Sequence, residues 1–591
     1  MRLIKLCCFR SLPASVLSRI AFAIVLILAN RAFAQTSNQR PEPQAQAMPE
    51  ATVTHEIKGT VKVTVEADKP KGFLAPRALG VSWDMASNDI AQPLLPQILM
   101  SAGVTMLRYP GSSFADSYHW STNKSTWGQG SPSPNNDFGH FAKLLDQFGT
   151  AVVVVNYGSN LDGTGGGTPE EAAAWVAYAM GDPANTQSIG KDSSGHDWQT
   201  VGYWASIRAS QPLATDDGLN FLRIARPNPI LIKYWEVGNE VYRNGFYDGN
   251  GAEEDLHAAY AKDPKENEKQ RKRNPALSPD AYGNALLQFA KAMKVVDKRI
   301  SVGASLDIPL AGDWNVSGDW VEDPLHRGKY VQKGTAEAAG LGVAQKSFDA
   351  GIDWDKNVLK VAGKNIDFVS LHWYVADTTE ASHFKDLDNG KTLMKPEEEL
   401  PNILAALVDL FRKYGGQNIQ VLVTEFGVRP YANITEEIVP ALFAADAYAT
   451  MAEDGVANID WASLHKAFLS DEDKAGPVYF APQLVRRMAD LGDTIVNASS
   501  NNPLLAAHAA VHKDGSVGIM LINKDPKNNA TVKVGVGGAK LANTGARYDY
   551  GKNNRPSQYA ISGVAATDLG NNFTVTVPSY TATVLVISRA Q

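Results

Sequence analysis

The sequence predicts an α/β protein in which a (β/α)8 barrel is followed by a C-terminal β-sandwich. From residue 73 to residue 470, short apolar runs alternate with helical stretches, which is the pattern of a parallel α/β architecture. The apolar runs number eight, the number of strands in a closed barrel of this kind. From residue 471 to residue 591 the helical stretches largely disappear, and short alternating strands separated by Gly, Asn, Asp and Pro indicate a β-sandwich.

The first 34 residues are typical of a secretory signal peptide. Basic residues precede an apolar segment at residues 20–28, and Ala32-Phe33-Ala34 supplies a small-residue cleavage site before Gln35. The apolar segment is shorter than the roughly 20 residues that cross a bilayer. We therefore expect cleavage after Ala34 and a secreted or periplasmic protein. Both cysteines, Cys7 and Cys8, lie in this peptide, so the mature chain should contain neither a disulfide nor a thiolate metal site.

The charge balance limits the partners. The formal net charge is −7, and loss of the signal peptide removes five basic residues and no acids, which moves the charge from −7 to −12. Such a charge argues against nucleic acid or an anionic membrane as a partner. We expect no metal and no cofactor, and the sequence predicts no particular oligomeric state.

The remaining elements follow in chain order. Residues 35–51 are rich in Gln, Pro and Ala, which predicts a flexible leader. Residues 52–72 contain a run of alternating polar and apolar residues, which predicts a strand that joins the β-sandwich. Between the barrel strands lie helices such as the one predicted from Pro169, with Thr168 as its cap. The eight predicted barrel strands begin near Ala78, Thr105, Ala151, Leu231, Ile300, Ile366, Ile419 and Ala457.

Two of these strands end in a glutamate. The run L-I-K-Y-W-E-V-G-N-E at residues 231–240 delivers Asn239 and Glu240, and I-Q-V-L-V-T-E-F at residues 419–426 delivers Glu425. A lone glutamate is most often a solvated surface residue. Two glutamates at the carboxyl end of one barrel instead favour glycoside hydrolysis, because one carboxyl must protonate the leaving oxygen while the other attacks or stabilises the developing cation.

Further polar residues end neighbouring strands. Asn239 could bond a sugar 2-hydroxyl or simply end its strand in a turn. Arg108, in L-R-Y-P-G, could hold Glu425 ionised or form a structural ion pair. His372 and Tyr374, in S-L-H-W-Y, could orient Glu425, contact the sugar or belong to the core.

Aromatic and loop residues complete the candidate site. Trp83, Trp120, Trp373 and Trp461 fall at or near strand ends, where some could stack on sugar rings and others belong to the core. We predict Trp83, Trp461 and Asn156 as substrate contacts. The G-T-G-G-G run at residues 163–167 lacks the Lys-Ser/Thr of a phosphate loop, so it predicts a flexible loop over the pocket.

The order of the motifs L-R-Y-P-G, V-V-N-Y-G, G-T-P-E-E, Y-W-E-V-G-N-E, S-L-H-W-Y and V-T-E-F-G resembles the retaining glycoside hydrolases of the large (β/α)8 clan. It is closest to the family 51 α-L-arabinofuranosidases, with family 39 enzymes nearby. The resemblance implies Glu240 as the acid/base and Glu425 as the nucleophile. It also implies that Asn239 binds the 2-hydroxyl and that Arg108, His372 and Tyr374 surround the nucleophile.

This sequence departs from the family pattern at two places, and both affect recognition of the sugar rather than the catalytic residues. The family reads Arg-Tyr-Pro-Gly-Gly-Asn where this chain has Ser112 and Ser113 after Gly111. The family also has a sugar-binding glutamate after the first strand, where this chain has Trp83 and Asp84.

The expected function is an exo-acting α-L-arabinofuranosidase on plant-type or other polysaccharides, working by double displacement. The alternatives are another retaining glycosidase (a β-xylosidase, β-glucuronidase or galactofuranosidase) and a non-catalytic carbohydrate-binding protein.

We also expect a neighbouring negative charge to raise the pKa of Glu240.

Overall fold

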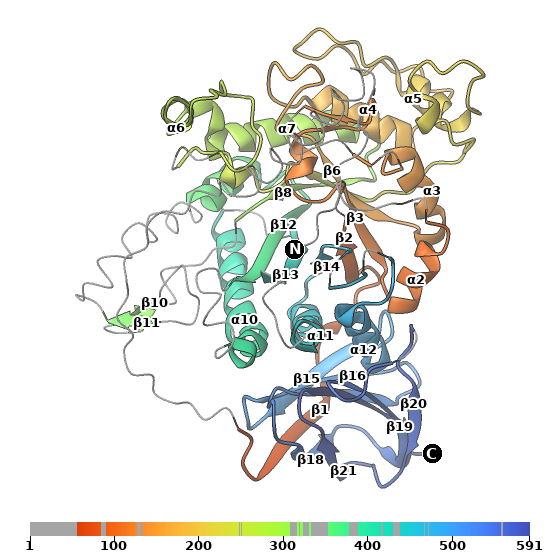
Figure 1. Cartoon of the computed structure of the whole chain (residues 1–591), viewed down its shortest axis with the longest axis vertical. Helices are drawn as coiled ribbons and strands as arrows, with labels where there is room; N and C mark the ends of the chain where they lie inside the picture. The colour runs from red at the N-terminus through yellow and green to blue at the C-terminus, as the bar shows by residue number, and fades with distance from the viewer. Residues whose placement is uncertain are drawn as a thin grey trace, which may run out of the picture. The chain divides into compact units, whose positions relative to one another are not determined.

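The computed structural model describes most of the chain from residue 56 onward (Figure 1). The predicted signal peptide and the leader at residues 35–51 lie outside the described residues. Within residues 56–591, the positions left out are 84, 86–89, 91, 127–131, 134, 248, 250, 308–315, 318–319, 323–329, 333–352, 377–387, 415–417, 430–437, 466, 471 and 557–558.

Eight parallel strands close into a barrel, as the sequence predicted. Their order around the barrel is β12-β13-β14-β2-β3-β6-β7-β8. The strands are mainly apolar and largely buried, because helices cover the outer face while side chains fill the interior. The bounds are β2 (Leu79–Ser82), β3 (Met106–Tyr109), β6 (Ala151–Val155), β7 (Tyr234–Val237), β8 (Ser301–Ser305), β12 (Phe368–Ala376), β13 (Gln420–Arg429) and β14 (Asn458–Ala462).

The helices surround the barrel, and several of them begin with a side-chain cap. In α4 (Pro169–Met180) the Thr168 side chain accepts a hydrogen bond from the Glu171 N–H, and Pro169 occupies the first turn, as predicted. The other helices are α2 (Leu95–Ala102), α3 (Phe138–Phe148), α5 (Val201–Ala209), α6 (Pro264–Arg271), α7 (Pro279–Val296), α10 (Asp388–Tyr414), α11 (Ile438–Glu453) and α12 (Ala481–Met488). None of these described helices combines the length and apolar character needed to cross a membrane.

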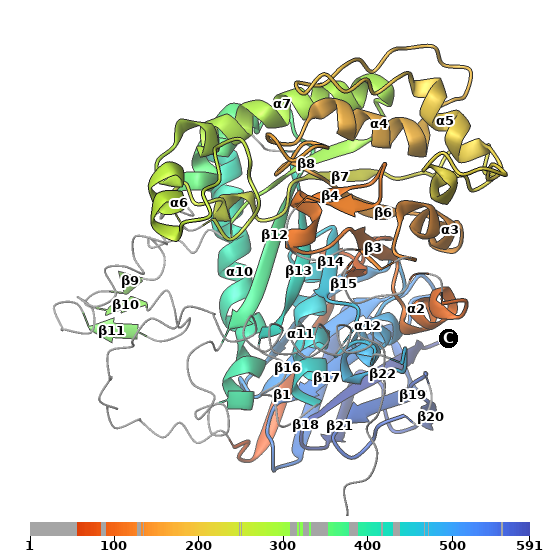
Figure 2. The same ribbon diagram turned by 45° about the horizontal axis from the view of Figure 1, so that its top comes forward.

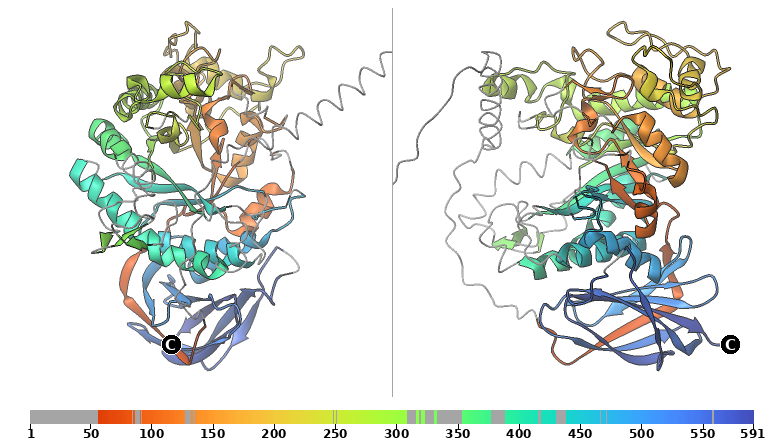
Figure 3. Two further views of the ribbon diagram at one scale, coloured as in Figure 1. Left: turned by 60° about the vertical axis from the view of Figure 1, so that its left-hand side comes forward. Right: turned by 45° about the vertical axis from the view of Figure 1, so that its right-hand side comes forward.

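A second, nine-stranded sheet follows the barrel in the order β20-β19-β22-β17-β16-β15-β1-β18-β21. Its member β1 (Thr60–Phe73) precedes the barrel in the chain, yet it pairs antiparallel with β15 and parallel with β18. Figure 3 shows this red-orange strand among the blue strands of the C-terminal region. The other strands are β15 (Thr494–Ser500), β16 (Leu505–Val511), β17 (Val517–Asn523), β18 (Ala530–Gly537), β19 (Leu541–Gly551), β20 (Gly563–Ala566), β21 (Asn572–Val577) and β22 (Thr581–Arg589).

A buried charge cluster joins the barrel helix α11 to this sheet; α11 and α12 lie beside β16 and β17 in Figure 2. Asp446 of α11 accepts from Lys524 Nζ at 2.8 Å and from His508 Nε2 at 2.9 Å. His508 Nδ1 also contacts Glu453 at 2.7 Å, and Lys524 contacts Glu397 at 2.9 Å. Because the side chains of Lys524 and Asp446 are both 0% exposed, each charge depends on the other for its stabilisation.

Replacing Lys524 by Met should therefore destabilise the protein strongly. Asp446 would keep His508 but lose Lys524, and breaking one side of a buried ion pair costs about 3–5 kcal/mol. Urea unfolding followed by circular dichroism measures the change. Lys527→Met, at an exposed position in the same loop, is the matched control. Equal stability of the two variants would contradict a structural role for the Lys524–Asp446 pair.

Candidate active site

The turn after β7 directs the first glutamate into the site. Gly238 has φ +73, and a Cβ there would lie 2.5 Å from Val241 and 2.9 Å from the Tyr157 side chain, so only glycine fits. Glu240 itself has φ +43, in the left-handed region that non-glycine residues seldom adopt. Strained backbone of this kind is found at functional sites, where the surrounding structure holds it in place.

The second glutamate, Glu425, lies in β13 beside His372 of β12. Arg108 Nη1 donates to Glu425 Oε1 at 2.8 Å, and the Ser112 N–H donates to the same oxygen at 3.3 Å. The Tyr374 hydroxyl donates to Oε2 at 2.5 Å. Burial favours the neutral carboxyl, but the electrostatic interactions with His372 and Arg108 outweigh it and lower the pKa of Glu425. The site therefore holds Glu425 as a carboxylate.

Arg108 is itself fixed by a residue that the sequence reasoning missed. Glu236, in the middle of β7, accepts from Arg108 Nε at 2.8 Å and from Nη2 at 3.1 Å. Nη2 also donates to Asn239 Oδ1 at 2.8 Å, and the Ser370 hydroxyl donates to Glu236 at 2.6 Å. The fully buried guanidinium thus links Asn239 to Glu425. The signal for Glu236 in the sequence was an acid inside an otherwise apolar strand.

Glu240 lies close to Glu425 and has both oxygens occupied. Its Oε1 contacts His372 Nδ1 at 3.0 Å and accepts from the Tyr242 hydroxyl at 3.1 Å. Its Oε2 accepts from Arg243. The same His372 Nδ1 lies 3.5 Å from Glu425 Oε2, so a single imidazole nitrogen contacts both carboxylates.

The expectation of a raised pKa for Glu240 is wrong for this arrangement. Burial does favour the neutral carboxyl, but the hydrogen bond and electrostatic interaction with His372, together with the charge of Arg243, outweigh it and lower the pKa of Glu240. The sequence reasoning considered only the neighbouring negative charge. It could not show that Arg243, three residues further along the chain, folds back onto the carboxylate.

A third carboxyl, Glu253, also lies at the site and was not identified from the sequence. The Ser113 hydroxyl donates to its Oε1 at 2.8 Å, and Arg243 Nη1 lies 3.8 Å from that oxygen. Burial, followed by the negative charges of Glu240 and Asp116, raises the pKa of Glu253 to about 9. Glu253 is therefore neutral at pH 7.

The other predicted contacts lie at the strand ends but are largely enclosed by protein. Trp83 follows β2 with 1% of its surface exposed, and Trp461 packs edge-to-face on Phe426 at 5.2 Å. Asn156, after β6, donates to the Tyr118 carbonyl and the Ser159 hydroxyl, both at 3.2 Å. Their role as sugar contacts stays a prediction.

Two other tryptophans belong to aromatic clusters of the core. Trp120 stacks on Trp175 with 5.6 Å between the ring centroids. Trp373 stacks on Phe443 at 5.4 Å. Neither is part of the polar cluster around Glu240 and Glu425.

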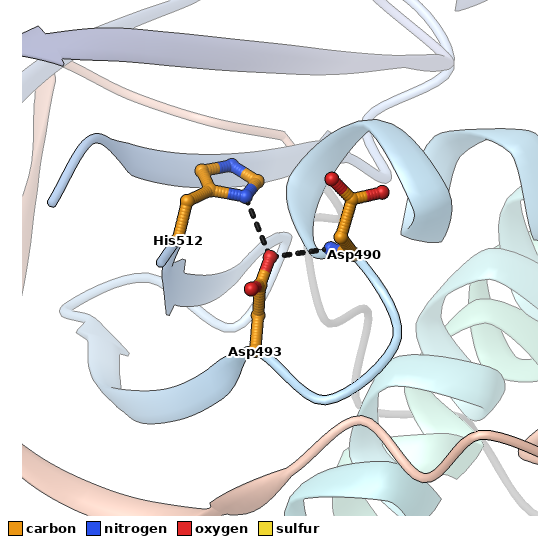
Figure 4. Close-up of side chains that lie close together, drawn as sticks. All are labelled: Asp490, Asp493 and His512. Carbon is orange, nitrogen blue, oxygen red and sulfur yellow. Dashed lines mark hydrogen bonds and ion pairs between the residues drawn. The ribbon is translucent and has the colours of Figure 1, made fainter. Parts of the chain in front are cut away.

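Asp490, Asp493 and His512 lie together where β15 begins and β16 ends in the second sheet (Figure 4). Asp493 Oδ2 contacts His512 Nδ1 at 2.7 Å and accepts from the Asp490 N–H at 2.7 Å. These contacts tie the turn between α12 and β15 to the end of β16.

Comparisons with known proteins support the fold. No family model matches the chain. Alpha-L-arabinofuranosidase C of Emericella nidulans is 27% identical over 175 residues, which are 28% of this chain and 27% of that protein. A probable alpha-L-arabinofuranosidase C of Aspergillus fumigatus is 28% identical over the same shares. The chain thus spans about a quarter of the length of the curated relatives that it matches.

Solved structures match over almost the whole chain. The α-L-arabinofuranosidase of Thermotoga maritima, solved with arabinose, has a TM-score of 0.60 at 18% identity and covers 89% of this chain and 99% of its own. A family 51 α-L-arabinofuranosidase of Bifidobacterium longum has a TM-score of 0.61 at 16% identity and covers 90% and 100%. These likenesses confirm that the chain has the barrel-plus-sandwich fold of the family 51 enzymes.

Proposed function

We propose that the chain is a retaining glycoside hydrolase and most specifically an exo-acting α-L-arabinofuranosidase. The observation that carries this proposal is the pair of carboxylates, Glu240 and Glu425, that contact the same His372 nitrogen at the carboxyl end of the barrel. In (β/α)8 enzymes the chemistry takes place at this end.

The mechanism assigns a different role to each of the two carboxylates. Glu425, held ionised by Arg108 and Tyr374, attacks the anomeric carbon and forms a glycosyl-enzyme ester. Glu240 gives a proton to the leaving oxygen in this step. It then takes a proton from the water that attacks the ester, and the second inversion restores the original anomeric configuration.

The spacing of the carboxylates supports retention. His372 Nδ1 lies 3.0 Å from Glu240 Oε1 and 3.5 Å from Glu425 Oε2. The distance between these two oxygens therefore cannot exceed the sum of the two contacts. Inverting enzymes separate the two carboxyl groups by about 6.5–9.5 Å to hold a water between them, whereas retaining enzymes use about 5–5.5 Å. The shared imidazole therefore keeps the facing oxygens closer together than almost all of the inverting range, which supports direct attack by Glu425.

The furanoside preference is supported by the names of the relatives and by the motif order. Asn239 fits the same chemistry, because Arg108 occupies its amide oxygen and the amide nitrogen is the atom that would donate to a 2-hydroxyl. Oligo- or polysaccharide is the corresponding partner class.

The proposal that the protein is secreted rests on the predicted signal peptide. Mass spectrometry of exported protein should find Gln35 at the N-terminus. Export of the uncleaved chain would contradict cleavage after Ala34.

A panel of nitrophenyl glycosides tests the sugar assignment. We expect kcat/KM to be highest on the α-L-arabinofuranoside and lower on the β-D-xylopyranoside, β-D-glucuronide and β-D-galactofuranoside. Activity on a pyranoside alone would overturn the furanoside assignment while leaving the two-carboxylate mechanism. A folded protein that binds carbohydrate but hydrolyses none of these substrates would support the non-catalytic alternative.

A further inference from the structure

Arg243 is a half-exposed cation directly beside the acid/base. Its side chain is 47% exposed, whereas those of Glu240 and Glu253, which it faces, are 12% and 1% exposed. It lies in the short 3-10 helix η3 (Val241–Arg243) that follows Glu240. Nothing in the mechanism described above uses this guanidinium.

The contacts of Glu240 show on which side of the scissile bond Arg243 lies. Oε1 faces His372, and through it Glu425, and is also held by Tyr242. Oε2 is the oxygen left to protonate the leaving group, and in the free protein it is covered by Arg243. A leaving group that accepts the proton from Oε2 must therefore lie next to Arg243.

The charges around Arg243 change when Glu240 carries the proton that it has to donate. Arg243 then loses its ionised partner, and the other carboxyl within reach, Glu253, lies 3.8 Å away and is still buried, which is the largest cause of its raised pKa. Glu425 does not replace it, since that carboxylate is held by Arg108, the Ser112 N–H and the Tyr374 hydroxyl. Among the described residues around Glu240, Arg243 is thus left as a cation without an anionic partner on the leaving-group side.

We propose that Arg243 binds a carboxylate on the leaving group, so that the natural substrates carry a uronic acid next to the scissile bond. The proposal rests on the proposed glycosidase function and adds the chemistry of the leaving group to it. A guanidinium and a carboxylate match in a planar, two-bond geometry. Once Glu240 is protonated it is no longer an anion, and a uronate would replace it as the anionic partner of Arg243. The uronate would also draw Arg243 away from Glu240 Oε2.

Two aryl glycosides that differ in a single group test this proposal. Both carry the sugar that the wild type hydrolyses best in the nitrophenyl panel; one leaving phenol bears a 3-carboxylate and the other the neutral 3-carboxamide. We expect the wild type to favour the carboxylate by about tenfold in kcat/KM, the size of one hydrogen bond to a charged group. In Arg243→Gln this preference should vanish, and in Arg243→Lys it should be intermediate.

Arg299→Gln is the matched control, because Arg299 is an exposed arginine that lies just before the amino end of β8. It should keep the preference of the wild type. Equal kcat/KM for the two glycosides in the wild type, or the same ratio in Arg243→Gln, would overturn the role of Arg243. If the wild type hydrolysed neither glycoside nor any nitrophenyl substrate, the glycosidase assignment itself would fall, and this inference with it.

The pH profile on a neutral substrate gives a second readout. The groups that face Glu240 are His372 of β12, Glu425 of β13, Tyr242 and Arg243 of η3, and Glu253 of the following loop. Arg243 lowers the pKa of Glu240, and activity falls as pH rises through the pKa of an acid that must be protonated. Arg243→Gln should therefore move the alkaline limb to higher pH. An unchanged limb would contradict the contact between Arg243 and the acid/base.

Discussion

Replacing Glu425 by alanine should abolish turnover, with a fall in kcat on the order of 10⁵-fold or more, as expected when an enzyme loses its covalent nucleophile. Nitrophenyl α-L-arabinofuranoside gives the rate. The fold should survive, because Arg108 keeps both of its contacts to Glu236.

The matched control is Glu268→Ala, which removes an exposed glutamate from α6. It should retain full activity. Circular dichroism and unfolding curves would separate loss of chemistry from loss of structure. A folded Glu425→Ala protein with more than about one percent of wild-type kcat would show that another group attacks the sugar.

Replacing Glu240 by alanine should divide substrates according to their leaving groups. Loss of a general acid costs about 10²–10⁴-fold where the leaving oxygen needs a proton. An unsubstituted phenyl glycoside should therefore slow far more than a dinitrophenyl glycoside, whose leaving group departs without protonation. With the dinitrophenyl substrate the glycosyl-enzyme should accumulate, because no base remains to activate water.

Azide should then restore turnover of that activated substrate, because a small anion can attack the intermediate from the space left by Glu240 and needs no general base. The product should be a glycosyl azide with the configuration opposite to that of the ester intermediate. Equal losses on both substrates together with no response to azide would remove Glu240 from the acid/base role.

The barrel could be predicted from the sequence because its strands are continuous apolar runs. The runs at residues 231–240 and 419–426 became β7 with its following turn and β13, and the shared end of parallel strands placed Glu240 and Glu425 together. A buried parallel strand needs no distant partner to be recognised, since its composition alone marks it. The sequence also predicted that the strand at residues 52–72 joins the β-sandwich, but it could not identify the strands with which it pairs. The pairing of β1 with β15 and β18 depends on contacts across more than 400 residues, for example Val63 with Ser500.

The residues that set the charges of the site could not be predicted in the same way. Glu253 meets Ser113 across 140 positions in the chain, and Arg108 meets Glu236 across 128. Arg243 is close in sequence to Glu240, but its contact depends on the left-handed backbone of Glu240 and the 3-10 turn after it. A pKa reflects such local geometry, so an argument from the neighbouring negative charge alone predicted the wrong direction for the pKa of Glu240.

The anomeric configuration of the first-formed product tests the central claim most directly, since double displacement by Glu425 and Glu240 requires two inversions. Proton NMR of the first turnovers on an α-L-arabinofuranoside, recorded before the released sugar mutarotates, should show the α-anomer. Release of the β-anomer would show a single displacement by water and would contradict the assignment of Glu425 as the nucleophile.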